Sequence, residues 1–174
     1  MKRINRLLPA FLLLLVSGQA AATTVNYSVS HDGFGGQYEY SITNDTLGFE
    51  IFELTIHFDY EIFASLSNPG VPVGWDPLVV DPVEFVNDDG FYDVLALGAG
   101  IAPGETLGGF TIDFVLLGGQ IPGAQRFEVL NPLTFAAIEE GLTELSPIPV
   151  PAALWLFASG IFGLLAFTRR KAAV

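Results

Sequence analysis

The sequence predicts an all-β domain, an antiparallel, immunoglobulin-like β-sandwich, set between an N-terminal signal peptide and a C-terminal transmembrane helix. Three observations predict this. The middle of the chain is a series of short segments with alternating hydrophobicity, separated by turn residues. A short apolar run follows basic residues at the start, and a longer uncharged run precedes basic residues at the end. We therefore divide the chain into a signal peptide (1–22), an acidic sandwich (23–140), a proline-rich stalk (141–151), a transmembrane helix (152–167, with the apolar run starting at 148) and a basic cytoplasmic tail (168–174).

The N-terminus has the three parts of a secretory signal. Three basic residues precede the apolar run 7–16, and the small residues "SGQAAA" follow it. Such a run is too short to span a bilayer, so the pattern predicts removal by signal peptidase. Small residues permit cleavage after Ala22, our preferred site, or after Ala20. A retained anchor or a buried core helix is the alternative interpretation.

The first strands show a repeat of two residues. "TVNYSVS" and "GQYEYSITN" each alternate apolar and polar positions, and "IFELTIHFDY" does so most clearly. Such alternation indicates one face in the core and one face in water. The predicted inward residues are Val25, Tyr27, Val29, Tyr38, Tyr40, Ile42, Phe52, Leu54, Ile56 and Phe58.

The later strands are predicted in "FYDVLAL", "GIAPGETLGGFTIDFVLL", "QRFEVL" and "LTFAAI". Pro103 and Gly104 fit the centre of a type II turn, which favours proline first and glycine second. The four prolines between Asn68 and Asn87 predict a long connection there. "FAAIEEGL" is compatible with a single helical turn.

The charges separate the middle of the chain from its ends. All 19 acidic residues lie between Asp32 and Glu144, and Arg126 is the single basic residue of that region. So negative a surface repels phosphate backbones, which excludes nucleic acid as a partner. It suits solubility outside a cell, divalent cations or a cationic partner. The absence of cysteine excludes disulfides, thiolate zinc sites and thiol nucleophiles.

The C-terminal run predicts a membrane-spanning helix. Residues 148–167 carry no charge, and as a helix they would reach about 30 Å, the thickness of the hydrocarbon core. Arg169, Arg170 and Lys171 form a basic stop that stays in the cytoplasm by the positive-inside rule. The topology is therefore type I, with the sandwich outside the cytoplasm. An apolar helix packed into a globular core is the alternative.

The prolines before this run, at alternate positions from Pro147 to Pro151, predict an extended segment that a membrane protease could hold. A stiff spacer that no protease cuts is the alternative. The segment "PIPVPAALWLFASGIFGLLAFTRRK" as a whole resembles the PEP-CTERM sorting signal, in its Val-Pro-x-Pro variant, because the name-giving Pro-Glu-Pro is absent. The residues that carry this resemblance are Pro147, Pro149, Val150, Pro151, Trp155, Ser159 and Gly160.

The resemblance implies a location and a partner. Proteins with such a tail are exported by Gram-negative bacteria that make exopolysaccharide, and an exosortase is thought to cut near the proline motif. It implies that this chain crosses the inner membrane, is anchored there transiently and then reaches the cell surface or the extracellular matrix. Association with exopolysaccharide in a biofilm follows as an expectation.

No sequence motif predicts a catalytic site. His31 and His57 are the two histidines, each in a setting where a solvated side chain is expected, and no hydrolase or phosphate-binding motif occurs. The predicted function is therefore a non-enzymatic surface or matrix protein. The alternatives are a permanently anchored type I module that binds glycan or protein, and a small secreted hydrolase.

No cofactor is predicted, and calcium is the one metal for which the sequence offers candidates. "NDDGFYD" places hard oxygen ligands around a glycine turn, although the spacing of an EF-hand is not met. The calcium candidates are Asn87, Asp88, Asp89 and Asp93. Asn26 and Asn44 each begin an N-glycosylation sequon.

Overall fold

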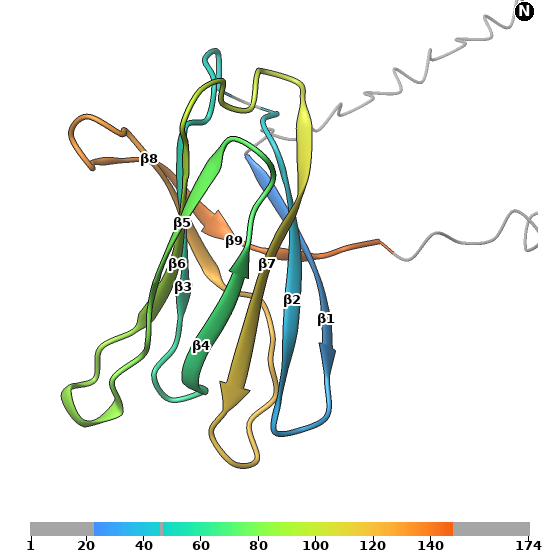
Figure 1. Cartoon of the computed structure of the whole chain (residues 1–174), viewed down its shortest axis with the longest axis vertical. Helices are drawn as coiled ribbons and strands as arrows, with labels where there is room; N and C mark the ends of the chain where they lie inside the picture. Colours follow the sequence, from blue (N-terminus) through green and yellow to red (C-terminus); the bar gives the residue numbers. More distant parts are fainter. Residues whose placement is uncertain (1–22, 46, 148–174) are drawn as a thin grey trace, which may run out of the picture.

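The computed structural model describes residues 23–45 and 47–147, which form ten strands and one 3-10 helix. The strands make two five-stranded sheets that face each other (Figure 1). Every strand pairing is antiparallel except that of β1 with β10. The predicted antiparallel β-sandwich is confirmed. The predicted signal peptide, transmembrane helix and basic tail lie outside the described residues, and no helix within the described ranges is long and apolar enough to cross a membrane.

We call the two layers sheet I and sheet II. Sheet I has the order β10-β1-β2-β7-β4, and sheet II the order β5-β6-β3-β8-β9. The strands of sheet I are β1 (Thr24–His31), β2 (Gly35–Thr43), β4 (Phe63–Gly70), β7 (Thr106–Leu116) and β10 (Glu144–Leu145). Those of sheet II are β3 (Glu53–Phe58), β5 (Trp75–Val80), β6 (Gly90–Ala96), β8 (Arg126–Leu130) and β9 (Ala137–Leu142), and the 3-10 helix η1 spans Glu84–Val86.

The core between the sheets is rich in aromatic rings. Tyr38 lies at its centre, with its ring stacked on Tyr40 at 5.5 Å and tilted against Phe114 at 4.9 Å. Trp75 meets Phe110 edge to face at 5.2 Å. Such pairs add to the stability that burial alone supplies. With no disulfide available, this aromatic core holds the two sheets together.

One buried polar side chain fixes a loop at the end of the sandwich. Asn44 is fully buried, and its Nδ2 donates to the carbonyl oxygens of Phe49 at 2.9 Å and Ile101 at 2.8 Å. Its Oδ1 accepts from the backbone N–H of Leu47 at 3.2 Å. A glycan on Asn44 would have to occupy the same space, so that sequon cannot be used in the folded domain.

Two predictions for connecting segments were wrong. Residues 68–87 are not one connection, because they include the end of β4, all of β5 and η1. Pro77 is tolerated there since β5 lies at a sheet edge, where a missing N–H costs no ladder bond. "FAAIEEGL" forms no helical turn, because residues 137–142 pair with β8 as strand β9.

The sandwich also extends past residue 140, into the predicted stalk. Thr143 is buried and exchanges hydrogen bonds with Gln125, and β10 then pairs with β1. The backbone N–H of Ser146 donates to the carbonyl oxygen of Tyr27 at 2.7 Å. A strand of two residues is too short to show alternation, so the sequence could not predict it. In Figure 1 the last described residues run out on the side of β1.

Candidate functional site

The outer face of sheet II combines carboxylates with apolar side chains. Because side chains opposite each other in a sheet share a face, the pairing of β3 with β6 and β8 fixes what lies there. Thr55 lies between Asp93 and Glu128, and Glu53 lies between Leu95 and Leu130. On the edge strands, Leu78 pairs with Asp93 and Glu140 with Glu128. The outer-face residues of the three inner strands are Glu53, Thr55, His57, Phe91, Asp93, Leu95, Arg126, Glu128 and Leu130.

Two of the carboxylates on this face have partners. Thr55 Oγ1 donates to Asp93 Oδ1 at 2.5 Å, and the guanidinium of Arg126 contacts Glu128. His57 Nε2 lies 3.6 Å from Glu128 Oε1, too far for a hydrogen bond. Burial, followed by the charge of Arg126, lowers the pKa of His57 from its ordinary 6.5, so this imidazole is neutral at neutral pH. Arg126 is the one cation near these acids among the described residues.

Glu53 has a buried carboxylate oxygen without a partner. The residue is 5% exposed, and its Oε2 makes no hydrogen bond. Burial, and then the charge of Asp93, raises the pKa of Glu53 above its ordinary value. Burial also raises the pKa of Asp93, against the effect of the Thr55 hydrogen bond. An unpaired buried carboxylate destabilises a fold, so Glu53 stands out as a residue that stability does not explain.

This finding corrects the prediction for β3, whose second face was expected to lie in water. Glu53 and Thr55 are both buried. The flanking strands carry Leu95 and Leu130 on the same face, on either side of Glu53. Alternation shows which residues share a face. It does not show how far neighbouring side chains cover that face.

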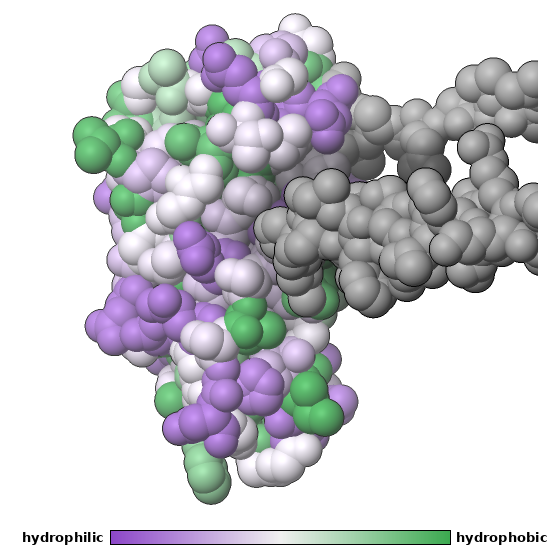
Figure 2. Space-filling model, turned by 90° about the vertical axis from the view of Figure 1, so that its right-hand side faces the viewer, coloured by the Kyte–Doolittle hydropathy of each residue, from purple (hydrophilic) through white to green (hydrophobic). Residues whose placement is uncertain are grey.

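The outer face of sheet I differs in character. Figure 2 views the molecule from the side of β1 and β2 and shows polar residues with isolated hydrophobic ones between them. The residues that alternate with the core positions there are mainly hydroxyl and amide side chains: Thr24, Asn26, Ser28, Ser30, Gln37, Glu39, Ser41 and Thr43. On sheet II, Leu78 and Val80 of β5 and Ile138 and Leu142 of β9 are more than one third exposed, as Val115 and Leu145 are on sheet I. The two outer faces therefore differ chiefly in the buried, unpaired carboxylate oxygen of Glu53 on sheet II.

An apolar pocket lies at the end of sheet II, next to Glu53. Its volume is about 230 Å³, and Leu130, the register partner of Glu53, is one of its walls. The other walls are mostly apolar. The residues that line the pocket are Phe49, Glu50, Phe52, Val129, Leu130, Asn131, Pro132, Leu133 and Ile138.

The hairpin between β8 and β9 presents apolar side chains beside this pocket. Leu133 is 89% exposed and Phe135 is 70% exposed. Asn131 holds the loop, because its Oδ1 accepts from the N–H of Leu133 at 3.0 Å and its carbonyl oxygen accepts from the N–H of Phe135 at 2.8 Å. Phe135 has a φ of 55°, a left-handed conformation that is rare for a bulky residue. In Figure 1 this loop stands out from the body of the sandwich, away from β1.

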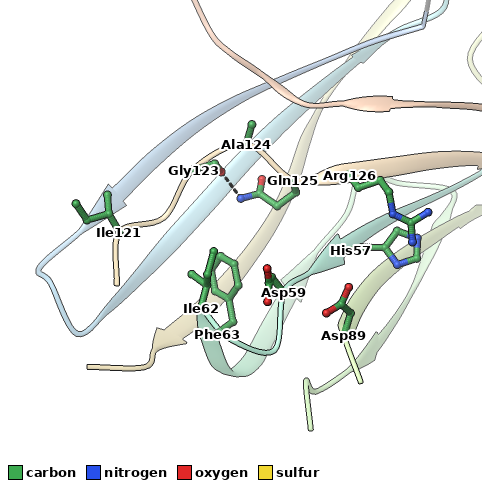
Figure 3. Close-up of a pocket in the computed structure, with 10 residues that line it drawn as sticks. All are labelled: His57, Asp59, Ile62, Phe63, Asp89, Ile121, Gly123, Ala124, Gln125 and Arg126. Carbon is green, nitrogen blue, oxygen red and sulfur yellow. Dashed lines mark hydrogen bonds between the residues drawn. The ribbon is translucent and has the colours of Figure 1, made fainter. Parts of the chain in front are cut away.

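A second pocket, of about 240 Å³, lies at the opposite end of the sandwich (Figure 3). It contains His57, Arg126 and the carboxylates of Asp59 and Asp89. Asp59 accepts from the N–H of Glu61 at 2.7 Å, and Asp89 accepts from the N–H of Tyr60 at 3.2 Å. Both carboxylates therefore hold the turn between β3 and β4. The described residues that line this pocket include no serine, lysine or cysteine, the side chains that most often act as nucleophiles.

The calcium candidates do not converge. Asp89 binds the backbone of Tyr60, and Asp93 binds Thr55 on the outer face of sheet II. Asn87 takes a left-handed conformation after η1, and the backbone of Asp88 pairs with Val83. Within residues 23–45 and 47–147, no three histidine, aspartate or glutamate side chains gather closely enough to hold a metal ion.

Most residues predicted for processing lie outside the described part of the chain. These are Ala20, Ala22, Pro149, Val150, Pro151, Trp155, Ser159, Gly160, Arg169, Arg170 and Lys171. Pro147 is described, and it is exposed and follows β10 outside any strand. The structure thus places the first proline of the predicted motif directly after the end of the domain.

Comparisons with known proteins find only distant likenesses. No protein-family model and no curated protein matches the chain. The solved chitin-binding domain of Chi18aC from Streptomyces coelicolor is 17% identical, with a TM-score of 0.38, over 61% of this chain and 90% of that one. A type I cohesin–dockerin complex from Clostridium thermocellum matches at 14% identity and a TM-score of 0.38, over 70% and 99%. A type II cohesin domain from the cellulosome of Acetivibrio cellulolyticus matches at 12% identity and a TM-score of 0.37, over 71% and 85%.

These TM-scores are too low for likeness alone to assign fold or partner. The two-sheet architecture rests on the strand pairings themselves. The candidate site likewise rests on its own geometry: a buried carboxylate, its acidic neighbours and an adjoining apolar pocket.

Proposed function

We propose that this chain is an exported, non-enzymatic surface or matrix protein whose sandwich binds a partner through the outer face of sheet II. Export rests on the two ends of the sequence, which resemble a signal peptide and a PEP-CTERM tail. Exosortase cuts the tail in this proposal, and the mature domain resides in the exopolysaccharide layer. A permanently anchored type I module is the competing proposal for the tail alone.

The observation that supports the binding role is the contrast between the two outer faces. Sheet I carries mainly small polar groups on the outer positions of β1 and β2, with Val115 and Leu145 as its exposed apolar side chains. Sheet II keeps an unpaired carboxylate oxygen, and at the β8–β9 end of the same sheet Leu133, Phe135 and Ile138 are exposed. Exposed apolar groups in one area mark interaction sites more often than isolated ones do.

The placement of the chain end supports the same role. Pro147 follows β10, which lies at the edge of sheet I beside β1. A tail that leaves there keeps the outer face of sheet II directed away from its attachment (Figure 1). A domain attached through its C-terminal segment on one side can bind a partner on the opposite side without changing its conformation.

Intact mass of the mature chain tests the sorting part of this proposal. The full chain would be expressed in a host that makes exopolysaccharide, with and without its exosortase, and recovered from each cell fraction. We expect a chain that begins near Thr23 and ends between Pro147 and Pro151 in the surface fraction. A full-length tail in both hosts would favour permanent anchoring, and an uncut chain in the cytoplasm would overturn export.

A further inference from the structure

We propose that Glu53 and the apolar pocket beside Leu130 together form a docking site for a protein segment that carries an apolar side chain next to a lysine or arginine. This inference rests on the proposed binding function and names the chemistry of the partner. The apolar side chain fills the pocket, and the cationic group pairs with Glu53.

The negative charge of this face indicates that the partner carries a positive charge. Glu53, Asp93, Glu128 and Glu140 lie on one face of sheet II, and Arg126 is the one basic residue among the described ranges. Arg126 already contacts Glu128, which leaves Glu53 and Asp93 without a cationic partner. A cation from another molecule would neutralise the charge of this pair. Complementary charge also favours the correct partner over others.

The pocket indicates that the partner segment also carries a large apolar side chain. Phe52, Leu130 and Ile138 form an apolar hollow of a size suited to one large aliphatic or aromatic side chain. Leu130 also lies directly opposite Glu53, so the pocket and the carboxylate are neighbours. A segment with its apolar and basic groups one or two residues apart would reach both. Leu133 and Phe135 of the hairpin extend the apolar contact.

The exposed side chains favour a protein over a polysaccharide. Sugar rings are usually held by stacking on flat, exposed tryptophan or tyrosine rings. Trp75 and four of the five tyrosines are buried, and Tyr60 is half-buried. A large side chain in a desolvated pocket, ringed by polar groups, is instead the arrangement of a protein–protein hot spot.

The test uses the full chain in neutral-detergent micelles, with empty micelles as the blank. The probe is a synthetic peptide of alternating leucine and lysine, and titration calorimetry gives its Kd. Matched peptides of alternating leucine and glutamate, and of serine and lysine, check the two requirements separately. An N-acetylglucosamine oligomer is the sugar probe.

We expect the leucine–lysine peptide alone to bind, and Glu53→Gln to weaken it about tenfold, as loss of one partner of a buried charge pair does. Leu133→Ser is expected to weaken it as well. Glu39→Gln removes the same charge from the exposed face of sheet I, and is the matched control, with less than a twofold effect. Glu128→Gln is the second variant, should Glu53→Gln fail to fold.

Equal weakening by Glu39→Gln and Glu53→Gln would overturn the proposal, because the net charge of the domain would then be responsible. Binding of the sugar oligomer in place of the peptide would also overturn it. These results are independent of export. If the chain reaches the cell surface but does not bind the peptide, the docking site is refuted and the proposed export is not. If the chain binds the peptide but stays in the cytoplasm, the proposed function is refuted.

Discussion

The hydroxyl group of Tyr92 donates a 2.7 Å hydrogen bond to the backbone carbonyl oxygen of Gly70. Tyr92 belongs to β6 and Gly70 to β4, so this bond crosses from sheet II to sheet I. Burial raises the pKa of Tyr92 above the range in which it could ionise under ordinary conditions, so the hydroxyl remains a donor. The bond is therefore a fixed link between the layers.

Replacement of Tyr92 by phenylalanine tests this link. We expect Tyr92→Phe to lower the free energy of unfolding by about 1 kcal/mol, because the carbonyl oxygen of Gly70 loses its partner while the ring remains. Thermal unfolding followed by circular dichroism measures the change. Tyr60→Phe is the control, since the Tyr60 hydroxyl makes only a 3.4 Å contact with Glu61 at the surface. An equal loss in both variants would contradict the assignment.

Asn44→Ala should be more damaging. It would leave the carbonyl oxygens of Phe49 and Ile101, and the N–H of Leu47, without the partners that Asn44 supplies. Unsatisfied buried groups cost about 1–3 kcal/mol each in mutational series, so we expect a loss of at least about 2 kcal/mol. Urea unfolding at constant pH measures it. Gln37→Ala, an exposed change, is the control, and a loss no larger than that of Gln37→Ala would refute the role of Asn44.

The close approach of Gly141 to Phe127 gives a third prediction. A Cβ on Gly141 would lie 2.7 Å from two ring atoms of Phe127, which is buried in the core. We expect Gly141→Ala to destabilise the domain by about 1–3 kcal/mol through overpacking. Gly98→Ala, where an added Cβ meets nothing within 4 Å, is the matched control. A neutral Gly141→Ala variant would mean that β9 is free to move away from β8.

Glu53 and Asp93 predict how stability depends on pH. Their pKa values are raised in the folded chain, above ordinary values of 4.5 and 3.8. Between the ordinary and the raised values the folded chain binds more protons than the unfolded chain, so their contribution to stability falls as the pH rises through that window. The titratable and charged groups on the same face are His57 of β3 itself, and Asp76, Arg126, Glu128 and Glu140 of the other strands.

Glu53→Gln should therefore stabilise the domain at neutral pH and flatten this dependence. Unfolding measured from pH 4 to pH 7 checks both effects, with Glu39→Gln as the control for loss of one charge. A variant that is less stable than the parent at pH 7 would show that the charge of Glu53 is compensated within the domain. A stabilising change that weakens peptide binding would show that the residue serves binding at the expense of stability.

The sequence predicted the fold from its long alternating strands. The inward positions of β1, β2 and β3 were expected correctly for Val25, Tyr38 and Leu54, which are buried. Apolar side chains at every second residue can be buried together only if the segment is a strand with that face in the core. The pattern therefore predicts both the strand and its buried face. Three strands were missed: β4 and β5, which each contain a proline, and β10, which has too few residues to show alternation.

The candidate site was only partly predictable. The surplus of acidic residues over basic ones was visible in the sequence and indicated a cationic partner. The burial of Glu53 was not visible, since it depends on Leu95 and Leu130 from two other strands. Leu133 and Phe135 fall in "LTFAAI", which was predicted as a strand, whereas the structure places both in the hairpin loop before β9. The order of residues along the chain does not show which side chains of different strands lie next to each other.

The pairing of β10 with β1 joins the last segment of the domain to the first. During synthesis, β1 is made early, and nearly the entire domain follows before Leu145 can pair beside it. The edge of sheet I therefore stays open until the last strand has been made. Proteolysis that removed Glu144 to Ser146 would reopen this edge, whereas a cut beyond Pro147 would leave the closed sandwich intact.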